Sequence, residues 1–193
     1  MVTGIPNVGK STLINKLAGK NITKVGDEPA VTKQQQKVYL KPKDVEREVI
    51  LHDTPGILWP KIHNPHSGYR LAILGSIKNT ATDYDDLGCY ASETLLHQYP
   101  EALSKRYGLS HLPASDIELL ESIGAKRGAK QSKGRINLHK VSEILIHDIR
   151  SGALGKLSLE TPDMIQREIA EVTRAHAEKE EKQQQRKNKR KNL

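Results

Sequence analysis

Residues 4–11 read Gly4-Ile5-Pro6-Asn7-Val8-Gly9-Lys10-Ser11, a Gly-x-x-x-x-Gly-Lys-Ser motif. The two glycines allow a tight turn whose N–H groups converge on nucleotide phosphates. Lys10 adds positive charge at the β- and γ-phosphates, and the Ser11 hydroxyl is suited to ligate Mg²⁺. A helix from Ser11 to Leu17, ended by Gly19, directs its positive dipole end at the same anion. The motif predicts a phosphate-binding loop whose nucleotide contacts come from Pro6, Asn7, Val8, Gly9, Lys10, Ser11 and Thr12.

A second motif, Asp53-Thr54-Pro55-Gly56, directly follows a short apolar stretch. A carboxylate at the end of a strand is where phosphoryl-transfer proteins anchor Mg²⁺, and Asp53 fits that position. The backbone N–H of Gly56 is then placed to contact the γ-phosphate. Alone, these four residues are also compatible with an ordinary turn after a strand. Their combination with the upstream phosphate loop favours a nucleotide site.

The order of elements along the chain indicates an α/β fold. After the first helix, residues 21–36 are polar and aperiodic, and strands are expected at 37–41 and 48–51. Residues 1–3 are too short for the strand that precedes a phosphate loop, so we expect part of the fold to lie upstream of Met1.

Beyond Pro60 the spacing of apolar residues becomes helical. We expect helices at residues 69–77, 87–99, 101–107, 115–123 and 138–154, and another that starts at Thr161-Pro162. The predicted domains are residues 1–80, which bind the nucleotide, and residues 81–175, which are helical. Residues 176–193 are predicted to be a basic, disordered tail, because they contain almost no side chains that can bury apolar surface.

The composition favours a polyanionic partner, since 31 Lys and Arg residues face 23 Asp and Glu residues for a net charge of +8. No apolar run approaches the ~20 residues that span a bilayer, and no signal peptide is visible. Cys89 is the single cysteine, which excludes an intrachain disulfide and a thiolate metal site. We expect a cytoplasmic monomer that contacts neither membrane nor DNA.

The chain resembles ribosome biogenesis GTPase A through its motifs. These are Gly4-Ile5-Pro6-Asn7-Val8-Gly9-Lys10-Ser11-Thr12-Leu13-Ile14-Asn15, Lys24-Val25-Gly26-Asp27 with Val31-Thr32, and Asp53-Thr54-Pro55-Gly56-Ile57-Leu58-Trp59-Pro60. That family is a circularly permuted GTPase, in which the guanine-binding Asn-Lys-x-Asp motif precedes the phosphate loop. The motif is absent here, since Asn15-Lys16-Leu17-Ala18 lacks the aspartate. The resemblance thus implies a partial, permuted P-loop GTPase core, truncated at its N-terminus and followed by a small all-α C-terminal domain.

The resemblance also implies a function and a ligand set. It implies a factor that binds and hydrolyses GTP during assembly of the large ribosomal subunit and docks on ribosomal RNA in its GTP state. Mg²⁺ would be held by Ser11, Thr32 and Asp53, although spacing alone does not choose Thr32 over Thr23. Asn7 matches an asparagine that holds K⁺ in potassium-dependent relatives; alternatively, it is a loop asparagine that tolerates an unusual backbone angle.

Ile57 stands where Ras-like proteins carry a glutamine that orients the attacking water, and an isoleucine cannot do so by hydrogen bonding. The family implicates a histidine upstream of the phosphate loop instead. No catalytic residue is therefore assigned in this chain.

A basic loop in the helical half is the expected RNA contact. Its residues are Lys126, Arg127, Lys130, Lys133 and Arg135, a cluster suited to phosphate contacts, although such a loop can also be merely solvated. Two other functions stay open from sequence: an RNA-binding module that acts without nucleotide, and an ATPase built on the same loop.

Overall fold

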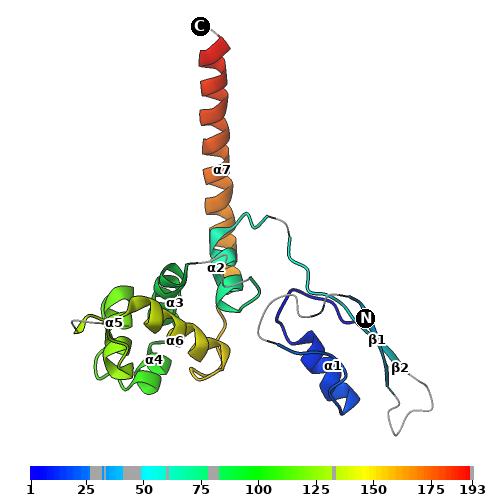
Figure 1. Cartoon of the computed structure of the whole chain (residues 1–193). Helices are drawn as coiled ribbons and strands as arrows, with labels where there is room; N and C mark the ends of the chain where they lie inside the picture. Colours follow the sequence, from blue (N-terminus) through cyan, green and yellow to red (C-terminus); the bar gives the residue numbers. More distant parts are fainter. Residues whose placement is uncertain are drawn as a thin grey trace.

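The computed structural model describes residues 1–26, 32, 34–40, 49–59, 61–77, 83–131 and 134–191. Figure 1 shows an N-terminal lobe, a helical lobe and a long C-terminal helix that rises away from both. The N-terminal lobe contains α1 (Lys10–Ala18), β1 (Gln36–Leu40) and β2 (Val49–Asp53). Of the residues named in the sequence motifs and the basic loop, Asp27, Val31, Pro60 and Lys133 lie outside the described residues.

The strands of the N-terminal lobe pair in a register that places Asp53 at one end of the sheet. β1 and β2 are antiparallel, with Gln36 opposite Asp53 and Leu40 opposite Val49. Val2 forms an isolated parallel bridge to Asp53, and its N–H donates to the carbonyl of His52 at 2.9 Å. Residues 1–3 therefore run beside β2 and lead directly into the phosphate loop, without forming a strand of ordinary length.

α1 is held against the sheet by its buried side. Ile14 is fully buried, whereas Leu13 and Leu17 are more than half exposed. Asn15, on the buried side, is nearly inaccessible as well. The helix ends at Gly19, as its sequence predicted.

Every described element after residue 64 is helical apart from short loops and one bridge between Lys130 and Ile136. Side-chain oxygens at N-caps start several helices, since Asn64, Ser115 and Asn137 each accept a hydrogen bond from a backbone N–H of the first turn. The helices are α2 (Pro65–Ile73), α3 (Tyr84–Gln98), α4 (Pro100–Tyr107), α5 (Asp116–Arg127), α6 (Leu138–Arg150) and α7 (Pro162–Lys191).

The core of the helical lobe forms around α3, which packs against α5 and α6. Gly88 allows the closest approach, because a Cβ there would lie 2.0 Å from the Ser142 hydroxyl on α6. Ala72 and Ile73 of α2 are buried in this same cluster. α2 therefore packs with the helical lobe, although the sequence analysis placed it before the domain boundary at residue 80.

α7 continues to Lys191, where the sequence analysis predicted a disordered tail from residue 176. Its C-terminal part is rich in Glu, Lys, Gln and Arg, which have high helix propensity even without burial. At its base, Glu168 pairs with the buried Arg70 of α2 and accepts a 2.9 Å hydrogen bond from Asn64. Within the part of the chain that the structure describes, no helix has the length and apolarity to cross a membrane.

Candidate nucleotide-binding site

The phosphate loop links Val2 to α1 with a backbone that turns through two left-handed residues. Asn7 has φ 58°, which asparagine tolerates better than most side chains, and Gly9 has φ 84°. The Lys10 ammonium donates to the carbonyl of Ile5 at 2.8 Å, so this side chain lies back across the loop. Such a loop at the start of a helix presents its N–H groups to an anion.

The three predicted Mg²⁺ ligands lie together at one end of this loop. The Ser11 hydroxyl donates to Oδ2 of Asp53 at 2.8 Å and lies 3.2 Å from the Thr32 hydroxyl. Asp53 is fully buried, and its Oδ1 has no hydrogen-bond partner among the described residues. One carboxylate and two hydroxyl groups form the hard oxygen donor set that Mg²⁺ prefers, and the unpaired Oδ1 is suited to a metal-bound water.

Other metal sites have no support in the described chain. No group of three or more His, Cys, Asp or Glu side chains in the described ranges could hold a metal ion. Ser11, Thr32 and Asp53 form a cluster of a different kind, with one carboxylate and two hydroxyl groups.

Thr23 hydrogen-bonds within the N-terminal lobe, whereas Thr32 lies beside the Ser11 hydroxyl. Its hydroxyl donates to Oδ1 of Asn15 at 2.9 Å and lies 3.1 Å from the Ser11 carbonyl. Oδ1 of Asn15 also accepts from the N–H groups of Ile22 and Thr23, and its Nδ2 donates to the Thr23 carbonyl. Sequence reasoning missed this role of Asn15; the available signal was a polar, weakly helix-forming residue at a core-facing position.

The Asp53-Thr54-Pro55-Gly56 turn is in direct contact with the phosphate loop. A Cβ on Gly56 would lie 2.5 Å from Cα of Pro6, so only glycine permits this approach. The N–H of Ile57 lies 3.4 Å from the Gly4 carbonyl, and the Thr54 hydroxyl donates to the Val2 carbonyl at 2.7 Å. The Ile57 side chain is 75% exposed and carries no polar group. The turn that would sense a γ-phosphate therefore lies against the loop that would bind it.

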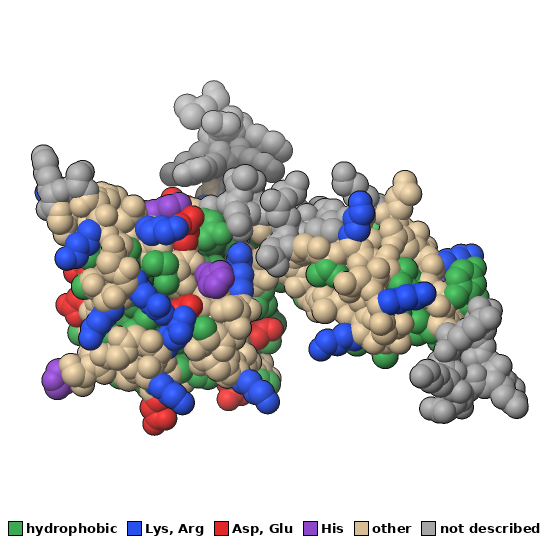
Figure 2. Space-filling view, turned by 60° about the horizontal axis from the view of Figure 1, so that its bottom comes forward, with side chains coloured by type: hydrophobic (Ala, Val, Ile, Leu, Met, Phe, Trp, Pro, Cys, Tyr) green, Lys and Arg blue, Asp and Glu red, His purple; other side chains and the backbone are tan. Residues whose placement is uncertain are grey.

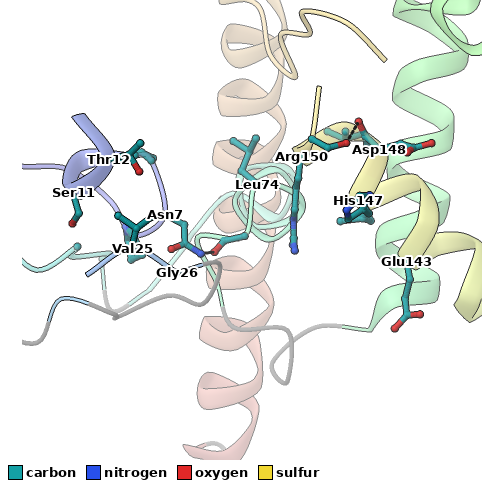
Figure 3. Close-up of a pocket in the computed structure, with 18 of the residues that line it drawn as sticks. Asn7, Ser11, Thr12, Val25, Gly26, Leu74, Glu143, His147, Asp148 and Arg150 are labelled. Carbon is teal, nitrogen blue, oxygen red and sulfur yellow. Dashed lines mark hydrogen bonds between the residues drawn. The ribbon is translucent and has the colours of Figure 1, made fainter. Parts of the chain in front are cut away.

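The end of α2 approaches the phosphate loop from the other side. The Asn7 amide donates to the Gly75 carbonyl at 2.8 Å, and the Ser76 hydroxyl donates to the Pro6 carbonyl at 2.8 Å. Sequence reasoning gave no sign of either contact, because 68 and 70 residues separate the partners. A cleft of about 1160 Å³ lies between the loop and α6 (Figure 3), with His147, Asp148 and Arg150 on its α6 side.

Asp148 on α6 is held by two arginines and a tyrosine. Arg106 donates to both carboxylate oxygens, at 2.9 and 2.7 Å, and the Tyr107 hydroxyl and Arg127 lie at 3.0 and 3.3 Å. Burial acts to raise the pKa of Asp148, but the hydrogen bonds from Arg106 and Tyr107 and the charge of Arg127 outweigh it, so the pKa lies below its ordinary value.

The predicted RNA-binding residues lie around the end of α5 and the loop that follows it. Lys126, Arg127, Lys130 and Arg135 are exposed, but Arg127 also pairs with Asp148 and lies 5.6 Å from the centre of the Tyr107 ring. Lys126 donates to the Gly108 carbonyl at 3.1 Å. Figure 2 shows Lys and Arg side chains spread over the helical lobe with acidic side chains among them.

Comparison with known proteins gives a consistent match. The family model described as "50S ribosome-binding GTPase" matches residues 1–86. "Ribosome biogenesis GTPase A" of Bacillus cereus is 45% identical over 172 residues, which cover 89% of this chain and 56% of that protein. The protein of the same name from Bacillus pumilus is 48% identical over 163 residues, which cover 84% of this chain and 56% of that protein. The chain thus spans little more than half the length of these relatives.

A solved structure has a similar fold. GNP-bound YlqF from T. maritima superposes with a TM-score of 0.52 at 26% identity, covering 83% of this chain and 57% of that one. Over the part that it shares with them, the chain is therefore similar to the ribosome biogenesis GTPase A proteins, and its fold is similar to that of YlqF.

Proposed function

We propose that this chain binds and hydrolyses GTP with Mg²⁺ and acts in assembly of the large ribosomal subunit. The observation that carries the proposal is the meeting of Ser11, Thr32 and Asp53 beside a phosphate loop that touches Gly56. The names of its relatives supply the ribosomal context and guanine as the base. A circularly permuted core, as the family resemblance implies, would supply the base-binding motif from a segment preceding the phosphate loop.

The described residues divide the nucleotide contacts among them. Ser11 and Thr32 would ligate Mg²⁺ through their hydroxyls, and Asp53 would do so through water; the bound ion neutralises charge on the β- and γ-phosphates. Lys10 would exchange its hydrogen bond with the Ile5 carbonyl for the phosphates. We propose the Asn7 side-chain oxygen as a K⁺ ligand, in an amide whose plane is fixed by its bond to Gly75.

A γ-phosphate would then set the state of two segments. Thr32 would close over the metal, and the Gly56 N–H would donate to the γ-phosphate, so both segments respond to hydrolysis. We propose that the GTP state docks on ribosomal RNA of the large subunit through the helical lobe and that hydrolysis releases it. Exposed, apolar Ile57 supplies no water-orienting group, so no catalytic residue is assigned.

Nucleotide binding is tested with the purified chain and fluorescent mant-GDP and mant-GTP in Mg²⁺ buffer. We expect saturable binding at micromolar concentrations and faster phosphate release in K⁺ than in Na⁺. Competition by GTP but not by ATP is expected of a protein that also carries the base-binding motif before the phosphate loop. Lys10→Ala should abolish the signal, whereas Lys61→Ala, at an exposed position outside the site, should not. Equal competition by ATP in that longer protein would instead identify an ATPase, and the absence of saturable binding would contradict the proposal for this chain.

A second candidate function is RNA binding without nucleotide, favoured by the exposure of Lys126, Lys130 and Arg135 on the helical lobe. Changing these three residues to glutamine should weaken binding to large-subunit RNA and reduce its dependence on salt. The matched control changes the exposed Lys16, Lys20 and Lys61 of the N-terminal part instead. RNA binding that is identical with GTP, with GDP and without nucleotide would favour this second function over a switch.

A further inference from the structure

The residues at the end of α2 hydrogen-bond two consecutive residues of the phosphate loop. The Ser76 hydroxyl, which is 1% exposed, donates to the Pro6 carbonyl, and the Gly75 carbonyl accepts from the Asn7 amide, both at 2.8 Å. The donor of the first bond therefore lies at the end of α2, and the donor of the second lies in the loop. Together they fix both the position and the orientation of the loop at Asn7, the residue with a left-handed backbone. A left-handed non-glycine residue persists where its surroundings hold it.

The geometry of that α2 end is itself well defined. The N–H of Gly75 donates to the Ala72 carbonyl at 2.9 Å, and the N–H of Ser76 donates to the Leu71 carbonyl at 2.8 Å. With Gly75 at φ 75°, these two bonds form a Schellman ending, which turns Gly75 and Ser76 toward the phosphate loop.

Arg150, in the last turn of α6, completes this ending from the helical lobe. Its Nε donates to the Ile73 carbonyl and its terminal nitrogen donates to the Ala72 carbonyl, both at 2.7 Å. A cation at a helix C-terminus is favoured by the helix dipole and can donate to the last carbonyls, of which that of Ala72 also accepts from the N–H of Gly75. The guanidinium also lies directly under Gly75, where a Cβ would meet it at 3.4 Å. Figure 3 shows Arg150 beside the turn at Leu74, which separates it from Asn7.

We propose that Arg150 and Ser76 are positioning residues for the phosphate loop. Through its bonds to the Ala72 and Ile73 carbonyls, Arg150 sets the place of Pro6 and Asn7, so the helical lobe controls the loop's affinity for a nucleoside diphosphate. By linkage, nucleotide bound at the loop favours the α6 arrangement that holds Arg150 on α2. The inference rests on the proposed nucleotide binding for its consequence, but the positioning itself can be measured without nucleotide.

The first measurement is hydrogen exchange by mass spectrometry in the nucleotide-free chain, on peptides covering residues 4–12. Ser76→Ala and Arg150→Gln should each speed exchange of the loop amides by about fivefold or more. Ser76→Ala removes the hydrogen bond to the Pro6 carbonyl, and Arg150→Gln removes the guanidinium that holds the end of α2. Arg150→Lys should restore part of the protection, because an ammonium can still reach one carbonyl. Lys140→Gln removes the same charge from α6 in the same cleft and should leave loop exchange unchanged.

The second measurement is the rate of mant-GDP dissociation. Ser76→Ala and Arg150→Gln should accelerate it about three- to tenfold, and the double variant should show less than the product of the single effects, because both act through one contact. If Ser76 and Arg150 had a purely structural role, the variants would lower the melting temperature without accelerating mant-GDP dissociation in this non-multiplicative way. If Arg150→Gln fails to fold, Ser76→Ala and Arg150→Lys carry the test.

The outcomes separate the two proposals. Loop exchange within twofold of wild type in both Ser76→Ala and Arg150→Gln would overturn the positioning role; if Arg150→Gln does not fold, the same result in Ser76→Ala would overturn it. If wild type binds no mant-GDP, the proposed nucleotide function fails, and the exchange result still decides whether Arg150 and Ser76 hold the loop.

Discussion

The Ser11 hydroxyl donates a 2.8 Å hydrogen bond to Oδ2 of Asp53, joining the two sequence motifs across 42 residues. The other oxygen of this buried carboxylate, Oδ1, has no partner among the described residues. Leaving a buried polar group unpaired costs about 1–3 kcal/mol, and more when it is charged. A hydrated cation beside Ser11 and Thr32 would remove that cost, which supports the proposed Mg²⁺ site.

Asp53→Asn should therefore weaken nucleotide binding only where Mg²⁺ contributes. We expect the affinity for mant-GTP in Mg²⁺ to fall by about tenfold or more, because a charged contact is lost, and the affinity in EDTA to change little. Titration in the two buffers makes the comparison. Asp163→Asn, at an exposed position at the start of α7, serves as the charge control. An equal loss in both buffers would place Asp53 outside the metal site.

Gly56→Ala should damage the contact between the acidic turn and the phosphate loop. The added Cβ would lie 2.5 Å from Pro6 Cα and 2.6 Å from its nitrogen, which are backbone atoms that cannot rotate away. We expect a loss of about 1–3 kcal/mol in the free energy of unfolding, measured by urea titration.

Gly68→Ala is the matched control for that substitution. Gly68 lies within α2, and a Cβ there would meet only a side-chain carbon of Ile62, at 3.9 Å. Alanine favours a helix interior over glycine by about 1 kcal/mol, so this variant should be unchanged or more stable. Equal destabilisation by the two variants would mean that the approach to Pro6 is not the cause.

The phosphate loop, α1 and the acidic turn could be predicted because each is encoded locally. Gly9-Lys10-Ser11 and the Gly19 stop are readable without knowing any partner. The choice between Thr23 and Thr32 could not be made, since it depends on Asn15 binding the Thr23 hydroxyl and backbone in space. The hydrogen bond from Ser76 to the Pro6 carbonyl could not be predicted from periodicity, because its partners are 70 residues apart in sequence.

The helices likewise combine locally encoded features with features that depend on distant contacts. Asn64 and Pro65 start α2 four residues before the predicted start at residue 69, because capping and proline at the first position extend a helix beyond its apolar stripe. The packing of α2 with α3 and α6 instead of the sheet depends on tertiary contacts. Periodicity identifies an apolar face but does not say which surface covers it.

Cys89 should react slowly with thiol reagents in the folded chain. Burial first, then a hydrogen bond with Asp116 and nearby acidic charges, raises the pKa of Cys89 from 9.0 to about 11. The thiolate fraction at pH 8 is then about a hundredfold lower than for an ordinary thiol. We expect slow labelling by a chromogenic disulfide and fast labelling in urea. Asp116→Asn should raise the native rate by only a fewfold; a rate equal to that of the unfolded chain would mean that burial is not the main cause.

Asp148 should make stability fall in acid. Its pKa is lowered in the folded state, despite the opposing effect of burial, by Arg106, Tyr107 and Arg127. The folded state therefore binds fewer protons than the unfolded state at acid pH. This contribution is fully present above the unfolded carboxyl pKa of about 3.9 and is lost as the pH falls through the lower folded value.

Asp148→Asn removes that linkage. At pH 7 we expect it to lower the free energy of unfolding by about 1–3 kcal/mol, because the buried carboxylate no longer accepts from Arg106 and Tyr107. Between pH 5 and pH 3 the variant should lose stability less steeply than wild type in urea titrations at each pH. Some slope will remain, since the Glu168 pKa is lowered by Arg70 and Asn64 against the effect of burial. Asp86→Asn, at an exposed position on α3, should keep the wild-type slope; an unchanged slope in Asp148→Asn would show that other carboxylates govern the acid transition.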